Sequence, residues 1–220
     1  MNPPPPAAQP PATTPLLIVI SAPSGGGKTT LCQQLLARHP EMVRAITCTT
    51  RPPRPGEVEG RDYYFLDEET FSRRIEAGVF LEHARVHDHR YGTPKTEVLE
   101  KLHQGRDVLL NIDVQGAATL CARAAADADL RHALVTVFLT PATVAELEER
   151  LRRRGTDSPA QLEKRLRAAR HEIAQWHKFQ YLIISTSIAE DVRRMEAIVD
   201  AERMRQCRAI FPIKERPDRS

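Results

Sequence analysis

Residues 16–30 read LLIVISAPSGGGKTT, an apolar run followed at once by a glycine-rich loop and a lysine. The apolar run predicts a buried strand at Leu16–Ser21, and the helix-forming residues after the loop predict a helix at Lys28–Arg38. Later apolar strands, predicted at Asp107–Ile112 and Ala133–Leu139, also alternate with helical segments. This alternation predicts an α/β fold in which helices cover both faces of a parallel sheet.

The loop between the first strand and the first helix has the pattern of a phosphate-binding P-loop, except that Ala22 stands at its first glycine. Glycines let backbone N–H groups turn toward phosphate oxygens, and the helix N-terminus adds positive charge. We expect Lys28 to reach the outer phosphates of a nucleoside triphosphate and the Thr29 hydroxyl to bind Mg²⁺. The alternative is an ordinary glycine-rich turn. The predicted triphosphate-binding residues are Ala22, Pro23, Ser24, Gly25, Gly26, Gly27, Lys28, Thr29 and Thr30.

The composition is that of a globular protein large enough for one domain, with 220 residues of which 41% are hydrophobic and 28% charged. The net charge of +3 is too small to indicate nucleic acid, and anionic small molecules suit it equally well. No apolar run approaches the ~20 residues that span a membrane, and we see no secretory signal. We therefore expect a cytoplasmic protein without a membrane or nucleic-acid partner. The scattered cysteines, which lack metal-binding spacing and indicate reduced thiols, are Cys32, Cys48, Cys121 and Cys207.

The chain ends are predicted to be flexible, because residues 1–15 hold seven prolines and no charge, and residues 212–220 are a charged tail. Between residues 44 and 86, short strands and turns follow one another closely, which predicts a small β-rich insertion. The other strands are predicted at Val43–Cys48, Tyr63–Phe65, Val79–Val86 and Tyr181–Ser185. The other helices are predicted at Asp67–Ala77, Lys95–Gln104, Gln115–Ala126, Thr143–Arg153, Pro159–Lys178 and Ala189–Ala209, with capping signals at Asp67 and Ser158.

The insertion carries residues that could recognise a second substrate. Arg51 and Arg54, held by prolines in TTRPPRPGE at 49–57, predict a fork for a phosphate, although a solvated basic loop has the same composition. Glu82 lies inside an apolar stretch, and a buried carboxylate needs a partner. The N1–H and N2–H₂ edge of guanine would supply two donors to it. Residues 90–94 are predicted to place a phenol, Tyr91, and a hydroxyl, Thr93, on a turn.

These motifs together resemble the guanylate kinase family. The matching segments, which fall in the family's order and spacing, are SAPSGGGK at 21–28, TTRPPRPGE at 49–57, YGT at 91–93 and DVQG at 113–116. The resemblance runs from about Leu16 to Arg208. It implies a P-loop nucleoside monophosphate kinase that moves the γ-phosphate of ATP to GMP or dGMP with Mg²⁺, in purine nucleotide metabolism. The implied parts of domain 16–211 are a core at 16–43, 94–140 and 166–211, a GMP-binding subdomain at about 44–93, and a helical lid at about 141–165.

The resemblance also implies a role for individual residues. Glu82 would read guanine N1 and N2, the Thr47 hydroxyl would donate to O6, and Asp113 would lie near the metal-bound waters. The GMP-binding residues would be Thr47, Arg51, Arg54, Tyr63, Glu82, Tyr91, Thr93 and Asp113. The catalytic residues would be Lys28, Arg51, Arg154 and Arg165, with Arg150 as a further candidate. Without the resemblance, the basic run at 148–156 reads as a solvated helix face.

Two positions depart from the family pattern. Asn111 replaces a usual aspartate, which affects how the Mg²⁺ waters are held, and Ser185 begins Ser-Thr-Ser where Asn-Asp-Asp is common near the adenine. Two other functions remain open: a kinase for another phosphorylated acceptor, such as a ribose bisphosphate, and a non-catalytic module that binds protein partners. Glu82 favours guanine over a sugar phosphate, and Lys28 favours an enzyme over a binding module. The sequence leaves open whether the chain is a monomer or a homo-oligomer.

Overall fold

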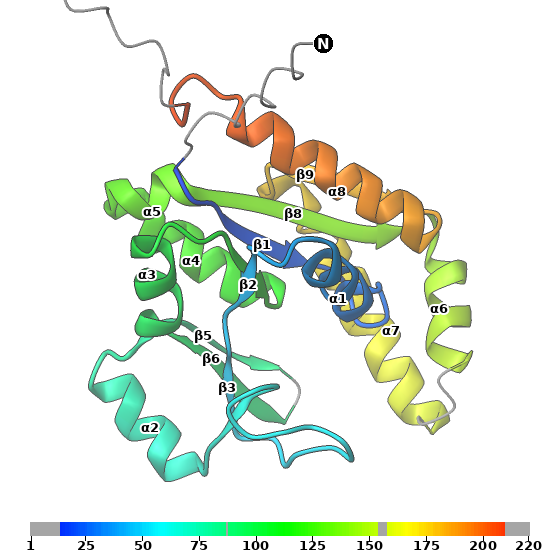
Figure 1. Cartoon of the computed structure of the whole chain (residues 1–220). Helices are drawn as coiled ribbons and strands as arrows, with labels where there is room; N and C mark the ends of the chain where they lie inside the picture. Colours follow the sequence, from blue (N-terminus) through cyan, green and yellow to red (C-terminus); the bar gives the residue numbers. More distant parts are fainter. Residues whose placement is uncertain (1–13, 87, 154–157, 210–220) are drawn as a thin grey trace, which may run out of the picture.

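The computed structural model describes residues 14–86, 88–153 and 158–209. Its core is a five-stranded sheet in the order β2-β7-β1-β8-β9, in which every paired strand is parallel (Figure 1). The strands are β1 Leu17–Ser21, β2 Val43–Arg44, β7 Val108–Asn111, β8 Leu134–Pro141 and β9 Tyr181–Ser185. The predicted α/β fold with a parallel sheet is therefore confirmed.

Helices cover both faces of this sheet because β1 is apolar from Leu17 to Ile20, so that its two sets of alternating side chains are both buried. Ile18 and Ile20 pack in one cluster with α1 (Lys28–Arg38) and α8 (Ile188–Arg203). Leu17 and Val19 pack in a second cluster with the helices of the opposite face. Those helices are α3 Lys95–His103, α4 Val114–Ala126 and α5 Ala128–Ala133.

A second, four-stranded sheet in the order β4-β3-β6-β5 forms the β-rich insertion (Figure 1). Its elements are β3 Cys48–Thr49, β4 Tyr64–Phe65, α2 Glu68–Glu76, β5 Phe80–Val86 and β6 His89–Pro94. The insertion has a small core of its own, in which the rings of Phe71 and Phe80 stack with centroids 4.7 Å apart. The Asp67 carboxylate caps α2 by accepting from the Thr70 backbone amide, as the sequence predicts.

Two helices extend beyond the core sheet, α6 (Val144–Arg153) and α7 (Pro159–Ile173), and a 3₁₀ turn, η1 (Trp176–Lys178), follows them (Figure 1). The helices pack through a short apolar seam that includes Leu147, Leu151 and Ala169. Ser158 and Gln161 form a reciprocal capping box with Pro159 at the first position of α7, so the predicted start of this helix is confirmed.

Several predicted elements were wrong. The strand predicted at Val43–Cys48 is two strands, because the chain leaves the core sheet after Arg44 and enters the second sheet at Cys48. Residues 90–94 are not a turn but part of β6, which pairs antiparallel with β5. Helix α5 was missed, and Asp127 caps it by accepting from Asp129 and Leu130 amides. The predicted helices that end early are α7, which stops at Ile173, and α8, which stops at Arg203.

The predicted tails fall largely outside the described residues: 212–220 entirely, and 1–15 apart from Thr14 and Pro15. Within the described part of the chain, no helix combines the length and apolar character that crossing a membrane requires.

Candidate active site

The glycine-rich loop turns tightly between β1 and α1. Gly27, which precedes the first turn of α1, has φ 96°, a left-handed conformation that side chains other than glycine rarely adopt. The Lys28 ammonium folds back and donates to the Ala22 carbonyl oxygen over 2.7 Å. Ala22 itself is buried, and its methyl group belongs to the apolar cluster that joins β1 to α1 and α8. The replacement of the usual first glycine by alanine is therefore absorbed by packing.

A second contact ties this loop to the α7 helix. The Ser24 backbone amide donates to the Glu172 carboxylate over 3.0 Å. Thr29 and Thr30 are exposed on the first turn of α1, so the Thr29 hydroxyl is accessible to a ligand.

One cavity, of about 190 Å³, brings the loop together with residues of the second sheet. It lies beyond the carboxyl ends of β1 and β7, the edge at which parallel sheets bind ligands. Its lining residues come from both predicted substrate sites: Lys28, Thr29, Thr47, Tyr63, Glu82, Val86, Tyr91, Asn111, Ile112 and Asp113. Sequence-distant candidates thus meet at one place.

Glu82 is the buried carboxylate of this cavity, with 1% of its surface exposed. The Thr93 hydroxyl donates to Glu82 Oε1 over 2.5 Å, from the neighbouring strand. Burial raises the pKa of the Glu82 carboxyl to about 7, although the hydrogen bond from Thr93 opposes this rise; the nearby Asp113 carboxylate adds to it. Glu82 lines the cavity, so its carboxylate can accept a hydrogen bond from a ligand there.

Arg51 and its aromatic neighbours form a second group beside the cavity. The Arg51 guanidinium lies 5.4 Å from the centre of the Tyr63 ring, and the Tyr63 and Tyr91 rings meet edge to face at 6.1 Å. Glu57, which sequence reasoning missed, holds Arg51 through both carboxylate oxygens and also accepts from the Arg54 backbone amide. The signal for Glu57 was its place at the end of the TTRPPRPGE motif, after both arginines.

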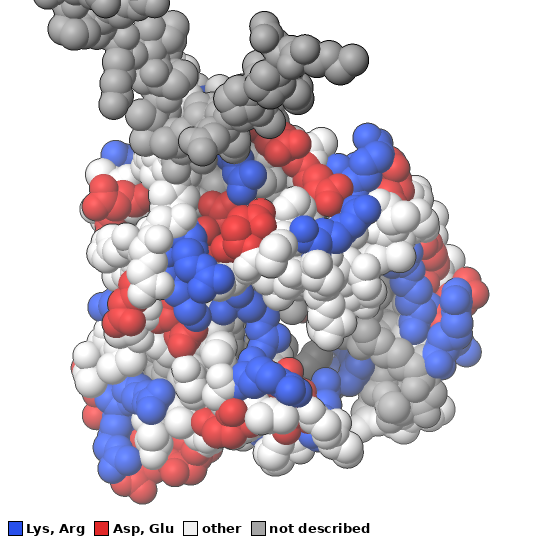
Figure 2. Space-filling view, viewed as in Figure 1, with Lys and Arg blue, Asp and Glu red and all other residues white. Residues whose placement is uncertain are grey.

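A neighbouring cavity of about 250 Å³ joins this group to helix α7. Figure 2 shows a hollow between the two parts of the molecule, with Lys and Arg side chains gathered at its rim. The charged and polar residues that line the cavity of about 250 Å³ are Arg51, Arg54, Asp88, His89, Tyr91, Gln161, Lys164 and Arg165. The structure therefore places Arg165 across from the predicted phosphate fork. Arg154 lies outside the described residues.

Arg150 crosses from α6 toward the end of β9. Its guanidinium nitrogens lie 3.3 and 3.4 Å from Ser185 Oγ, and Nη2 also donates to Glu146 over 2.6 Å. Ser185 in turn donates to the buried Asp191 over 2.6 Å. The Ser-Thr-Ser segment that departs from the family pattern is thus joined to α6 through Arg150.

Asn111 and Asp113 line the first cavity where β7 gives way to α4. The Asp113 carboxylate caps α4 by accepting from the Gly116 amide over 2.9 Å, and Gln115 also donates to it. Among the described residues, no group of three or more His, Cys, Asp or Glu side chains could hold a metal on its own. A metal at this place would therefore depend on few protein ligands.

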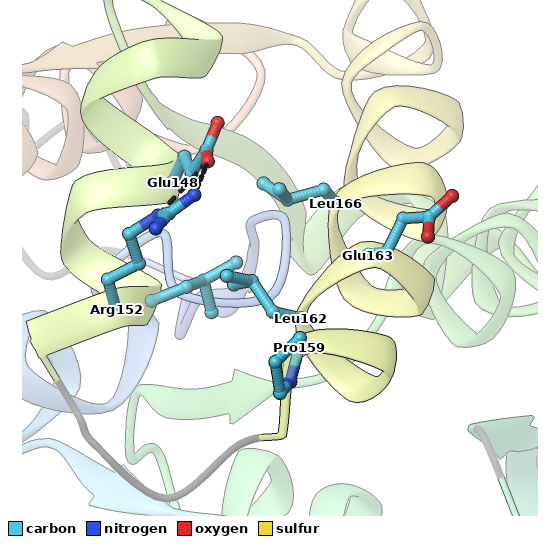
Figure 3. Close-up of a pocket in the computed structure, with 7 residues that line it drawn as sticks. Glu148, Arg152, Pro159, Leu162, Glu163 and Leu166 are labelled. Atoms are coloured by element: carbon cyan, nitrogen blue, oxygen red, sulfur yellow. Dashed lines mark hydrogen bonds and ion pairs between the residues drawn. The ribbon is translucent and has the colours of Figure 1, made fainter.

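A further cavity, of about 410 Å³, lies between α6 and α7 (Figure 3). Leu162 and Leu166 point into it from α7, and the Arg152–Glu148 ion pair closes one side. None of the predicted catalytic residues lines it, so it is separate from the two cavities described above.

Comparison with known proteins identifies relatives of this chain. The family model described as guanylate kinase matches residues 14–202. The guanylate kinase of Maricaulis maris (strain MCS10) is 43% identical over 180 residues, which cover 82% of this chain and 80% of that protein. The guanylate kinase of Paramagnetospirillum magneticum (strain ATCC 700264 / AMB-1) is 43% identical over 182 residues, which cover 83% and 82%.

A solved structure is similar over the same length. The crystal structure of guanylate kinase from Anaplasma phagocytophilum superimposes with a TM-score of 0.73 at 32% identity, and the match covers 91% of this chain and 92% of that one. The family model covers most of the chain, and the P-loop and the buried carboxylate lie in one cavity. This chain belongs to the guanylate kinase family.

Proposed function

We propose that this protein transfers the γ-phosphate of ATP to GMP, giving ADP and GDP, and that it also accepts dGMP, as part of purine nucleotide metabolism in the cytoplasm. The observation that carries the proposal is the shared cavity, in which Lys28 and Thr29 of the P-loop face the same space as the buried Glu82. A triphosphate site and a carboxylate that accepts from a base are the two halves of such a reaction.

The acceptor base is read by Glu82 and Thr47. An ionised Glu82 accepts from the N1–H and N2–H₂ groups of guanine, and the Thr47 hydroxyl, 8% exposed as a residue, donates to O6. Adenine has an acceptor at N1 and no amino group at C2, so it would leave this buried carboxylate without donors. Mismatches of this kind in buried polar sites cost about 10⁴-fold or more in specificity.

The acceptor phosphate is bound beside the Glu82 cavity, where the neighbouring cavity begins. Arg51 and Arg54 supply positive charge, and Tyr63 and Tyr91 present phenol groups beside Arg51. Thr93 acts on the base side of the site, because its hydrogen bond to Glu82 orients the carboxylate toward the base.

Phosphoryl transfer depends mainly on position and charge, because the phosphate oxygen of GMP attacks the γ-phosphorus directly and no nucleophilic side chain is needed. Lys28 and Arg51 approach the transferred group from the P-loop and from the second sheet. Arg165, and Arg154 beyond the described residues, act from the lid. These charges neutralise the transferred phosphoryl group, and closure of the lid excludes water that would hydrolyse ATP.

Mg²⁺ is the proposed cofactor. Mg²⁺ in kinases is held by one or two protein ligands, substrate phosphates and water, which fits a cavity with Thr29 and Asp113 but without a larger acidic cluster among the described residues. Thr29 would bind the ion through its hydroxyl and Asp113 through water. When bound, the ion withdraws charge from the β- and γ-phosphates of ATP.

A coupled assay of ADP production tests the proposal. Purified protein with ATP and Mg²⁺ should phosphorylate GMP and dGMP but not AMP, and the Lys28→Met variant should lose at least 99% of this activity, a loss on the order of 10²-fold. Lys95→Met, which removes an exposed lysine at the start of α3, is the matched control. Turnover of ribose bisphosphate but not of GMP would show a different acceptor, and absence of any turnover would favour a binding module.

A further inference from the structure

The Glu82 carboxylate occupies a space against α4 that exists only because residue 116 is glycine. A Cβ atom added to Gly116 would lie 2.4 Å from Glu82 Oε2, 3.2 Å from Glu82 Cδ and 3.3 Å from Asp113 Oδ1. The first of these distances is well inside the contact distance of carbon and oxygen, so an alanine here would force one of the two residues to move.

Gly116 is not required by its own backbone. It is the third residue of α4, in the first turn of the helix, and it is not among the glycines with positive φ. Glycine is a poorer helix former than alanine, so its presence calls for another reason. The room it leaves for the Glu82 carboxylate supplies that reason.

Glu82 has little freedom to move away. It is 1% exposed, its Oε1 is bonded to Thr93, and its strand pairs with β6 at this position. The helix is held as well, because Arg123 of α4 donates to the Phe80 carbonyl oxygen of β5 over 2.7 Å. This contact helps to hold the strand and the helix close together.

We propose that Gly116 is a specificity-determining positioning residue: its missing Cβ lets the Glu82 carboxylate lie in the orientation that accepts from both N1–H and N2–H₂ of guanine. This inference rests on the proposed GMP kinase function. Gly116 acts through Glu82 and does not itself contact the base. An alanine at this position turns or displaces the carboxylate, so one of its two hydrogen bonds to guanine is lost.

Comparing GMP with IMP distinguishes a lost hydrogen bond to the base from a general loss of folding or binding. IMP carries the N1–H of GMP but lacks the 2-amino group. In calorimetric titrations, Gly116→Ala is expected to lower the affinity for GMP at least tenfold and the GMP-to-IMP affinity ratio at least fivefold, with ATP affinity unchanged within twofold. Ala118→Gly, at an exposed position of the same helix, should lower the melting temperature but leave the GMP-to-IMP ratio unchanged.

Stability supplies an independent test, which also applies if Gly116→Ala alone does not fold. In the wild-type background, Gly116→Ala should lower the melting temperature, because of the clash with Glu82. In a Glu82→Ala background the same change should lower it by less than half as much, because only the milder contact with Asp113 Oδ1 remains and alanine is the better helix former. An equal loss in both backgrounds, or an unchanged GMP-to-IMP ratio in Gly116→Ala, overturns the inference. Wild-type protein that binds GMP without turnover overturns the proposed kinase function but leaves the role of Gly116 standing.

Discussion

Arg51 is held by Glu57: Arg51 Nη2 lies 2.8 Å from Glu57 Oε1 and 2.9 Å from Oε2. The same carboxylate accepts from the Arg54 backbone amide over 2.8 Å, and Arg51 Nη1 donates to the Pro52 carbonyl oxygen. One carboxylate therefore fixes both the side chain of Arg51 and the turn that carries Arg54. The arginine is oriented before any phosphate binds.

Glu57→Ala should weaken GMP binding. The loss of both contacts frees the Arg51 side chain and the 51–54 turn, and ordering them again on binding costs about 1–2 kcal/mol, which raises the KM for GMP roughly tenfold. The KM for ATP should stay within twofold. Glu69→Ala, at an exposed position of α2, is the matched control. A lower KM for GMP in Glu57→Ala would show that Glu57 competes with the phosphate instead of orienting Arg51.

Stability should depend on pH through Glu82. Because burial raises the pKa of this carboxyl from 4.5 to about 7, the folded state binds the proton more tightly than the unfolded state. The resulting stability is fully present below pH 4.5 and is lost as the pH rises through about 7. The melting temperature of Glu82→Gln relative to wild type should therefore increase from pH 4.5 to 8, corresponding to about 3 kcal/mol in the free energy of unfolding. A constant difference between the two proteins across this range would contradict the placement of Glu82 in a dry site.

Asn111→Asp tests how the metal is held. An added carboxylate in this cavity increases attraction for Mg²⁺ and its waters, so the Mg²⁺ concentration that gives half-maximal activity should fall by about two- to fivefold, with kcat kept or raised. Asn111→Ala is the control: it removes the amide without adding a charge, so the difference between the two variants is due to the added carboxylate. A large fall in kcat for Asn111→Asp would instead assign the amide a role of its own.

Asp107 should matter for stability and not for catalysis. It accepts from the Leu16 amide over 2.8 Å and from Arg203 over 2.6 Å, and its side chain is 9% exposed. Asp107→Ala leaves the buried Leu16 amide without an acceptor and removes the partner of the half-buried Arg203 guanidinium, which should cost about 1–3 kcal/mol in urea unfolding. The KM values at 25 °C should not change. Asp129→Ala, which removes an exposed carboxylate of α5, should change stability by less than about 0.5 kcal/mol.

Local patterns predicted most of the regular structure. The apolar run of β1 predicted a strand buried on both faces, and the caps at Asp67 and Ser158 begin their helices as expected. One error arose at residues 43–49, where a single stretch contributes strands to two sheets, because periodicity cannot show which partner a strand pairs with. Residues 90–94 were predicted as a turn because glycine is common in turns, but Gly92 lies within β6 and pairs with His83 of β5.

The amino-acid sequence by itself determined which chemical groups are present: a P-loop lysine and threonine, paired arginines, and a glutamate in an apolar strand. Only the tertiary structure brought Lys28 and Glu82 to one cavity, placed Glu57 against Arg51, and set the Glu82 carboxylate beside Gly116. The reason is physical. Spacing along the chain governs contacts within a helix or strand, whereas distances between elements depend on how the sheet and helices pack.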